Sequence, residues 1–404
     1  MTRVRSVTAA VVVLIVLHVV AVIAVDLHDR PSDVRSSGLY YDVPRYMEIV
    51  HASGRPYRDF AVEYPPLTLA ELELIVGPSQ PSTAARLAWA QLGLELVMLA
   101  GLAWGWGRRA VLGYLVLSLP LLVNPFVFTR SDMLAVTLAV LGVAALRRAR
   151  AGTGAVALVL GFFAKSWPVV LVPRLALERR WRALAAWATL TGIGLAAWVA
   201  WGGLGGVGDV VTFRGARGWQ VESLPGGLLQ LVAGGTARIQ RGTYRIGVAS
   251  LWARTGLAGA GVVVVALIWL LADRRSGPGS RVLRDGVAPL AAVAALLLAS
   301  PLFSSQFVLW LVPWAAIIVA EMRVTRPALR TLAGRLEAAL VGLVGAATVG
   351  TVVVFWRISA LAQSRPLAVL ALNGRNALVI AVVVVGLWRL AAGDTVRPER
   401  AAVA

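Results

Sequence analysis

The stretch AVALVLGFFAKSWPVVLVPRLAL, residues 155–177, sets the topology of this chain because its apolar run is broken by Lys165, Ser166 and Pro168. Each half holds about ten residues, which as a helix span about 15 Å, half the hydrocarbon core of a bilayer. One straight transmembrane helix is therefore a poor description of the block. The pattern predicts a re-entrant hairpin with Lys165 at its tip.

The rest of the chain contains ten uninterrupted apolar blocks of about the length that crosses a bilayer. Of the 404 residues, 58% are hydrophobic. We therefore expect an all-α polytopic membrane protein, one integral membrane domain over 1–404, with about 12 membrane helices when the hairpin counts as two. The predicted spans are 7–25, 83–104, 110–128, 132–147, 184–203, 247–272, 286–301, 305–320, 336–356 and 374–391.

The basic residues test this topology. The net charge is +19, but the arginines lie in short clusters between apolar blocks, as in cytoplasmic loops, so we expect no nucleic-acid partner. With the hairpin, 21 of the 38 arginines fall in cytoplasmic segments, whereas a single crossing at 155–177 would invert every later loop. Both termini are then cytoplasmic. Block 7–25 exceeds a usual signal core and has no small-residue cleavage site after it, so we expect an uncleaved first span.

The same topology places two long loops, 26–82 and 204–246, on the outer face. Residues 26–66 contain seven acids and five arginines, an exception in this basic chain. The chain has no cysteine, which excludes disulfides and cysteine metal sites, and its three histidines are too scattered for a metal site. We expect no metal, and we expect His18 and His28 to lie at the membrane interface.

Lys165 is the only lysine in a chain with 38 arginines. A sequence so rich in arginine has no need of lysine where any positive charge suffices, so a compact ammonium with three donors is indicated, and phosphate is its natural partner. The alternative is that Lys165 reaches a lipid headgroup or ends a helix.

The first outer loop contains two polar motifs. In DVPRYMEIV, 42–50, helical spacing predicts that Asp42 is an N-cap, and a cap position also suits a rigidly held general base. RPYRDFAVEYPPL, 55–67, carries charges and tyrosines before Pro65 and Pro66, which favour an extended chain. This segment suits contacts to a sugar, or forms a loop whose salt bridges satisfy one another.

Three further motifs lie at the outer ends of spans. In FTRSDMLAV we expect Arg130 and Asp132 to pair with each other. FRGARGWQVESLPGGLL, 213–229, contains Gln220 and Glu222 and predicts either a binding segment or an interfacial helix. SPLFSSQFVLWLVPW, 300–314, places Gln306 at a turn that a helix cap and an aromatic belt also explain.

Five stretches carry a family resemblance: YYDVPRYMEIVHASGRPYRDFAVEYPPL, RSDMLAVTLAVLGVAAL, GFFAKSWPVVLVP, RGWQVESLPGGLL and SPLFSSQFVLWLVP. In this order they resemble the polyprenyl-phosphate-sugar-dependent GT-C glycosyltransferases, specifically the glycosyltransferase 87 family of mannosyltransferase-like proteins. The resemblance implies a GT-C-like fold with Asp42 as general base. It assigns Glu63 and Tyr64 to the substrate-binding part of the first outer loop, and Lys165 to the lipid-phosphate end of the donor.

The expected function is that of an inverting glycosyltransferase in the plasma membrane of a bacterium, with its active site facing outside. It moves a hexose, mannose by resemblance, from a polyprenyl-phosphate donor to a lipid-linked or polysaccharide acceptor. The donor is a co-substrate, and no other cofactor is expected. The further candidate substrate-binding residues are Arg45, Arg58, Arg130, Asp132, Gln220, Glu222 and Gln306.

The alternative function is a polytopic transporter or flippase of a lipid-linked saccharide. Transporters also place charges and broken helices at membrane depth, but they usually carry matching breaks in both halves of the chain. Only one half of this chain contains such a break.

Overall fold

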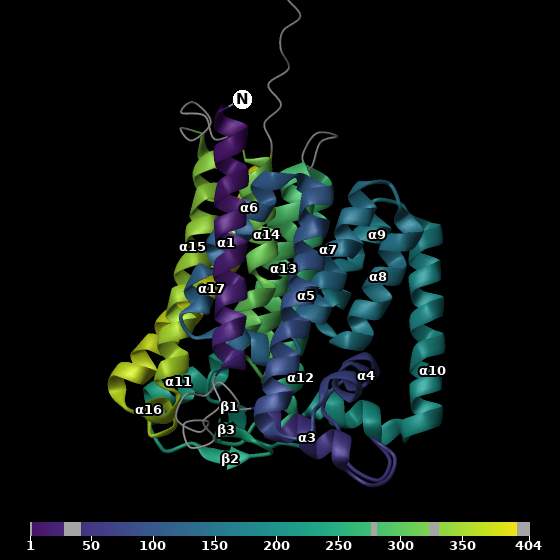
Figure 1. Cartoon of the computed structure of the whole chain (residues 1–404), viewed down its shortest axis with the longest axis vertical. Helices are drawn as coiled ribbons and strands as arrows, with labels where there is room; N and C mark the ends of the chain where they lie inside the picture. The colour runs from purple at the N-terminus through teal and green to yellow at the C-terminus, as the bar shows by residue number, and fades with distance from the viewer. Residues whose placement is uncertain (1, 28–41, 276–280, 323–330, 394–404) are drawn as a thin grey trace, which may run out of the picture.

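The computed structural model describes residues 2–27, 42–275, 281–322 and 331–393. Figure 1 shows a helical bundle whose long helices run between two ends. The N-terminus lies at one end. The opposite end, here called the loop end, carries helices α3 (Val43–His51) and α4 (Pro66–Ile75) and three short strands.

The remaining elements follow one another along the chain. The long helices are α1 (Thr2–Asp26), α5 (Gln80–Trp106), α10 (Trp181–Thr212), α12 (Leu251–Arg275), α15 (Leu332–Trp356) and α17 (Pro366–Ala392). The shorter ones are α6 (Arg108–Leu122), α7 (Met133–Arg147), α8 (Ala151–Ala164), α9 (Pro173–Leu177), α11 (Leu224–Ala233), α13 (Ala288–Ala299), α14 (Val312–Glu321) and α16 (Ile358–Ala362). The 3₁₀ segments η1 (Pro125–Thr129), η2 (Trp167–Leu171) and η4 (Ser305–Trp310) and the π-helix η3 (Leu283–Val287) complete the helical part.

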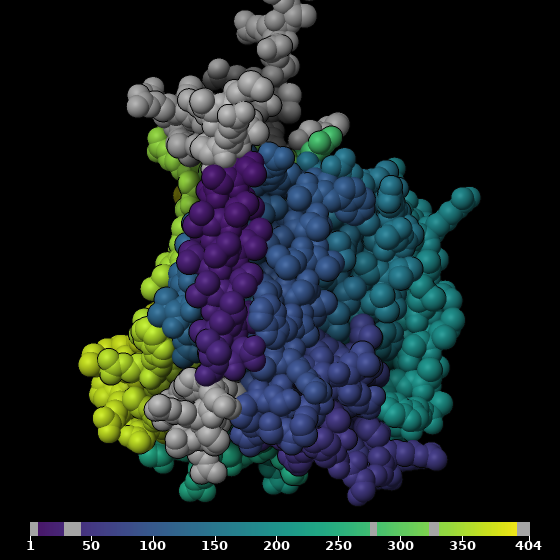
Figure 2. Space-filling model, viewed as in Figure 1, coloured from purple at the N-terminus to yellow at the C-terminus, as the bar shows by residue number. Residues whose placement is uncertain are grey.

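Six helices among the described residues are long and apolar enough to cross a membrane: α1, α5, α10, α12, α15 and α17. Their outward faces are apolar. In Figure 2, α1 forms a strip along the surface of the molecule, and its Val12, Val13 and Val20 side chains are more than half exposed. Exposed valines along a continuous helix fit a hydrocarbon environment. The chain is therefore an all-α polytopic membrane protein.

Four predicted spans, 110–128, 132–147, 286–301 and 305–320, correspond to shorter helices: α6, α7, α13 and α14. All four contribute buried residues to the core, and α7, α13 and α14 are buried along most of their length. Three short segments, η1, η2 and η4, are 3₁₀ turns rather than continuations of α-helices. Irregular backbone at membrane depth is tolerated where it is buried in protein or lines a cavity. The count of ten full spans stays a prediction.

The block at 155–177 changes direction at Lys165, which has an extended backbone (φ −149°, ψ 139°) between α8 and η2. Arg147, before α8, and Arg174, after η2, both reach the Asp285 carboxylate, with N–O distances of 2.5 and 2.8 Å. These two residues, one before α8 and one after η2, are therefore held at the same carboxylate, that of Asp285. On one side α8 packs closely on α7, since a Cβ at Gly154 would lie 2.9 Å from the Gly142 carbonyl oxygen.

We expect Asp285→Asn to destabilise the protein by about 1–3 kcal/mol, because it removes the carboxylate that Arg147 and Arg174 share. Arg174 is buried but keeps its ion pair with Glu178. Arg147 keeps its ion pair with Glu321, so the loss of counter-charge is partial. Thermal unfolding in detergent measures the effect. The matched control is Asp273→Asn, since Asp273 is exposed; equal melting temperatures for the two variants would contradict this account.

The segment 204–246 is more structured than its glycines indicate. Helix α10 continues to Thr212 beyond a break at Gly203 (φ 78°). Strands β1 (Trp219–Gln220), β2 (Arg238–Gln240) and β3 (Thr243–Ile246) then form a small antiparallel sheet in the order β1-β3-β2. The sheet lies at the loop end, on the same side as α3 and α4 (Figure 1).

The expectation for His18 is wrong. Its ring is 2% exposed, and its Nδ1 lies 3.0 Å from Glu95 Oε2 on α5. Tyr114 donates a hydrogen bond of 2.8 Å to the other Glu95 oxygen. A polar network inside the bundle therefore holds His18, while His28 lies outside the described residues.

Candidate functional site

The loop end of the bundle contains a cavity of about 400 Å³. It lies where 3₁₀ segments η2 and η4 and the turn after η1 meet residues 42–65 and 204–246. Eight of the eleven candidate site residues line it: Asp42, Glu63, Tyr64, Arg130, Lys165, Gln220, Glu222 and Gln306. Arg45 and Asp132 do not line it, but each forms an ion pair with a lining residue, Arg45 with Glu63 and Asp132 with Lys165. Arg58 is exposed and does not line the cavity.

Asp42 stands at the start of α3, as predicted, but its carboxylate makes no capping hydrogen bond. Its Oδ2 instead lies 3.2 Å from Arg130 Nη1, and its side chain is 25% exposed. The prediction that Asp42 accepts backbone N–H bonds is therefore wrong. Its carboxylate faces the cavity, where a substrate can reach it.

Lys165 ends α8, and its Nζ lies 2.7 Å from Asp132 Oδ1. The ammonium also lies 5.3 Å from the ring centroid of Phe307 and 5.9 Å from that of Trp310. Lys165 is thus directed into the protein and the cavity rather than toward a lipid surface. The expected pair between Arg130 and Asp132 is wrong, because each of these residues contacts a partner from another segment.

The turn that carries Arg130 and Asp132 is held from several sides. The Met133 N–H donates to the Gln91 side-chain oxygen at 3.0 Å, and Trp310 Nε1 donates to Asp132 Oδ1 at 2.9 Å. Tyr46 accepts a longer bond of 3.4 Å from the Ser131 N–H. The turn therefore offers Arg130 and Asp132 as fixed charges. Tyr46, which also lines the cavity, was not among the predicted site residues.

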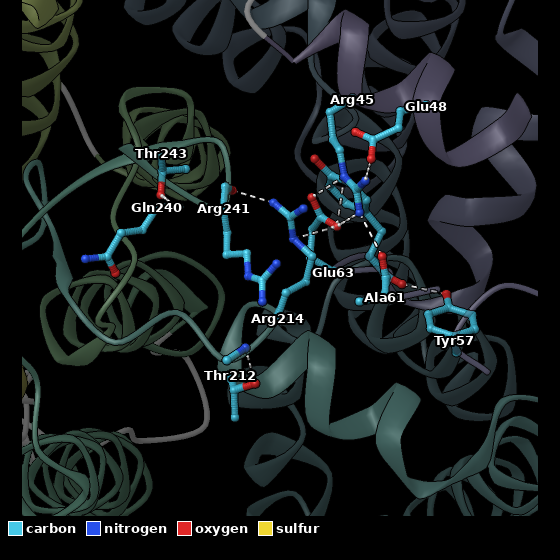
Figure 3. A network of polar contacts seen from close by, with 12 residues as sticks. Arg45, Glu48, Tyr57, Ala61, Glu63, Thr212, Arg214, Gln240, Arg241 and Thr243 are labelled. Carbon is cyan, nitrogen blue, oxygen red and sulfur yellow. Dashed lines mark hydrogen bonds and ion pairs between the residues drawn. The ribbon is translucent and has the colours of Figure 1, made fainter. Parts of the chain in front are cut away.

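The Glu63 carboxylate joins the two outer loops (Figure 3). Arg45 donates to it through Nη2 at 2.9 Å and Nε at 3.1 Å, and Arg214 Nε lies 3.2 Å away on the other side. Arg45 also donates to the Ala61 carbonyl at 2.8 Å. This geometry agrees with a loop whose salt bridges satisfy one another. Arg214 was not among the predicted site residues, although it lies in the motif at 213–229 from which Gln220 and Glu222 were selected.

Glu222 reaches the cavity from the turn after β1. One of its carboxylate oxygens accepts a hydrogen bond of 2.7 Å from Ser305 Oγ. Arg375 Nη2 donates to the Glu222 backbone carbonyl at 2.6 Å, and the Arg375 guanidinium lies 4.0 Å from the Phe303 ring centroid. Arg375 was missed as a supporting residue. An arginine inside a predicted span is the signal that would have found it.

The cavity is chemically uneven. Its charged side chains gather around the turn after η1, while apolar side chains form much of the remaining wall: Val169, Val210, Leu296, Leu297, Trp310 and Phe355. Such a surface suits an amphipathic ligand with a polar head and a hydrocarbon chain.

Burial affects the pKa values of two carboxyl groups that line the cavity, those of Asp42 and Glu222. The pKa of Asp42 is raised above its ordinary 3.8 by burial, against the opposing charges of Arg130 and Lys165. Burial also raises the pKa of Glu222, against Arg375 and the Ser305 hydrogen bond. Among the described residues, no cluster of histidine and carboxylate side chains has the geometry of a metal site.

The fold and the cavity define a class: a polytopic α-helical membrane protein with a charged, partly apolar site at one end of its bundle. No model of a known protein family matches the chain, and no curated protein shows significant sequence similarity to it. The chemistry of the site therefore rests on its own residues.

Proposed function

We propose that this protein is an inverting glycosyltransferase that moves a hexose, mannose by resemblance, from a polyprenyl-phosphate donor to an acceptor hydroxyl. One observation carries the proposal. Asp42, Arg130 and Lys165 come from three distant segments and line a single cavity, where Asp42 and Lys165 are both paired with residues of the turn at 130–132. A carboxylate and two cations beside one cavity are what transfer from a sugar phosphate requires.

The reaction needs one base and no acid, because phosphate is already a good leaving group. The acceptor oxygen attacks the anomeric carbon while its proton moves to the Asp42 carboxylate. The bond between the anomeric carbon and the phosphate oxygen breaks, and polyprenyl phosphate leaves with the electron pair. Attack opposite to the leaving group inverts the configuration, as in inverting glycosidases.

Lys165 and Arg130 stabilise the negative charge that develops on the departing phosphate. In the protein both cations are paired with carboxylates, Lys165 with Asp132 and Arg130 with Asp42. A bound phosphate competes for Arg130 and so releases the Asp42 carboxylate. Without that cation beside it, Asp42 becomes more basic. Donor binding and activation of the base are thereby coupled.

The apolar side of the cavity receives the first prenyl units, with Val169, Leu296 and Phe355 among its lining residues. Glu63, Tyr64, Gln220 and Glu222 supply hydrogen-bonding groups for sugar hydroxyls. The cavity is lined by segments of the loop end, and this end lies opposite the start of α1 (Figure 1). With both termini cytoplasmic by the positive-inside rule, the site faces the outside.

The direct test is incubation of the purified protein in lipid with radiolabelled polyprenyl-phosphate mannose and a panel of glycolipid acceptors. A labelled glycolipid that forms only in the presence of protein is the expected result. Movement of intact lipid-linked sugar between the leaflets of vesicles, with no new glycosidic product, would instead identify the transporter or flippase.

The rate of transfer is expected to fall as the pH drops through the raised pKa of Asp42, because the protonated carboxyl cannot accept the acceptor's proton. The acid limb of the kcat/KM profile therefore lies above pH 3.8, the ordinary pKa of the group. Profiles measured from about pH 4 to pH 8 at constant ionic strength show it. A rate that is flat down to the ordinary pKa would argue against Asp42 as the base.

A further inference from the structure

Three arginines gather beside the small sheet, at the rim of the cavity: Arg214, Arg245 and Arg254, here called the arginine cluster. The guanidinium carbons of Arg214 and Arg245 lie 5.5 and 5.0 Å from the ring centroid of Phe213. Burial, together with the charges of Arg254 and Arg214, lowers the pKa of Arg245 to about 10. These arginines are therefore close enough to repel one another.

Little negative charge balances the arginine cluster. Arg214 shares the Glu63 carboxylate with Arg45. Arg245 is 3% exposed and donates only to neutral oxygens, those of Thr243 and Gly218. Within the described part of the chain, Arg245 Nη2 and Arg254 Nε have no hydrogen-bond partner and neither residue has an ion pair.

A buried guanidinium without a counter-charge is costly. The unused donors of Arg245 and Arg254 are thus available to an anion that the described residues do not supply. This is an independent sign of a ligand, since a merely structural arginine would be expected to have a carboxylate or a full set of carbonyl partners.

The location indicates what kind of anion would reach the cluster. Phe213 and Thr243 line the cavity, and Arg245 contacts both of them. Arg254 lies in the first turn of α12, where Leu251 and Trp252 are 72% and 87% exposed. A tryptophan at the start of an apolar span is typical of the headgroup level of a bilayer. The arginine cluster therefore lies between the cavity and the layer of lipid phosphates.

We infer that the arginine cluster binds a phosphate ester at the rim of the cavity, at a site separate from Lys165. Guanidinium groups form paired, charge-assisted hydrogen bonds with phosphate oxygens, and three of them suit a doubly charged group. The phosphate belongs either to a lipid headgroup or to a free phosphorylated molecule. The binding site does not depend on the proposed glycosyl transfer.

The test measures thermal unfolding of the full-length protein in neutral detergent during titration with two probes, inorganic phosphate and a short-chain phosphatidic acid. Sodium chloride at matched ionic strength and a short-chain phosphatidylcholine are the controls. A ligand that binds the folded state raises the melting temperature, and above its Kd the rise follows the logarithm of the ligand concentration. We compare the wild type with R245Q, R254Q, K165M and R365Q, the last of which changes an exposed arginine outside the cluster.

Stabilisation of the wild type and R365Q beyond that given by the controls is expected, with apparent affinity about tenfold or more weaker in R245Q and R254Q. K165M should retain the affinity, which separates this site from the proposed donor site. Stabilisation by phosphatidic acid alone assigns the site to a lipid headgroup, and stabilisation by inorganic phosphate assigns it to a free phosphate. The inference is overturned if neither probe stabilises the protein more than the controls do. It is also overturned if R245Q fails to fold and R254Q binds with unchanged affinity.

Discussion

We expect Asp42→Asn to lower kcat for glycosyl transfer about 10²- to 10⁴-fold, the usual contribution of a positioned general base. Asparagine has the size of aspartate but cannot take the acceptor's proton. The Asp42 side chain makes no capping bond at α3, so the substitution leaves the helix start intact. The loss should therefore appear in kcat, measured with radiolabelled polyprenyl-phosphate mannose, while any fall in the melting temperature reflects the lost ion pair with the buried Arg130.

Donor binding distinguishes a lost base from a damaged cavity. Asp42→Asn removes the carboxylate that competes with phosphate for Arg130, so donor affinity should stay the same or increase. The matched control is Glu73→Gln, which changes an exposed carboxylate on α4 that does not line the cavity. Transfer at the wild-type rate by Asp42→Asn would remove Asp42 from the mechanism, and a similar loss in Glu73→Gln would point to a non-specific effect.

The class of fold was predictable because hydrophobicity is a local property. Apolar blocks mark α1, α5 and α17 without knowledge of the partners of these helices. The lengths of α13 and α14 were not predictable in the same way. Hydropathy reports how apolar a segment is, but not whether lipid or protein surrounds it, and only a segment enclosed by protein can end short in a 3₁₀ turn.

Much of the candidate site was predictable because charged residues in an apolar chain are few and conspicuous. Lys165, Asp42 and Glu222 stood out in this way, and all three line the cavity. Their partners were not predictable, since Arg130 and Asp132 look like a pair in the sequence. Tertiary packing places the start of α3 beside Arg130 and the end of α8 beside Asp132. Residue spacing along the chain does not predict these contacts.

Lys165→Met should lower kcat/KM for the polyprenyl-phosphate donor about 10²- to 10³-fold, the typical cost of removing one group that stabilises transition-state charge. The variant also leaves Asp132, which is 1% exposed on its side chain, without its cation. Instability of the protein is thus a second cause of lost activity. The double variant Lys165→Met with Asp132→Asn removes both charges, so it should recover the melting temperature without recovering transfer.

Lys165→Arg tests whether charge alone is sufficient. The ammonium lies between Asp132 and the rings of Phe307 and Trp310, a space that fits a compact group with three donors. A planar guanidinium is larger and directs its donors differently, so we expect donor use to fall about tenfold while the acceptor's KM is unchanged. In an otherwise lysine-free chain, wild-type kinetics of Lys165→Arg would mean that any cation suffices here, and that the phosphate contact assigned to Lys165 is wrong.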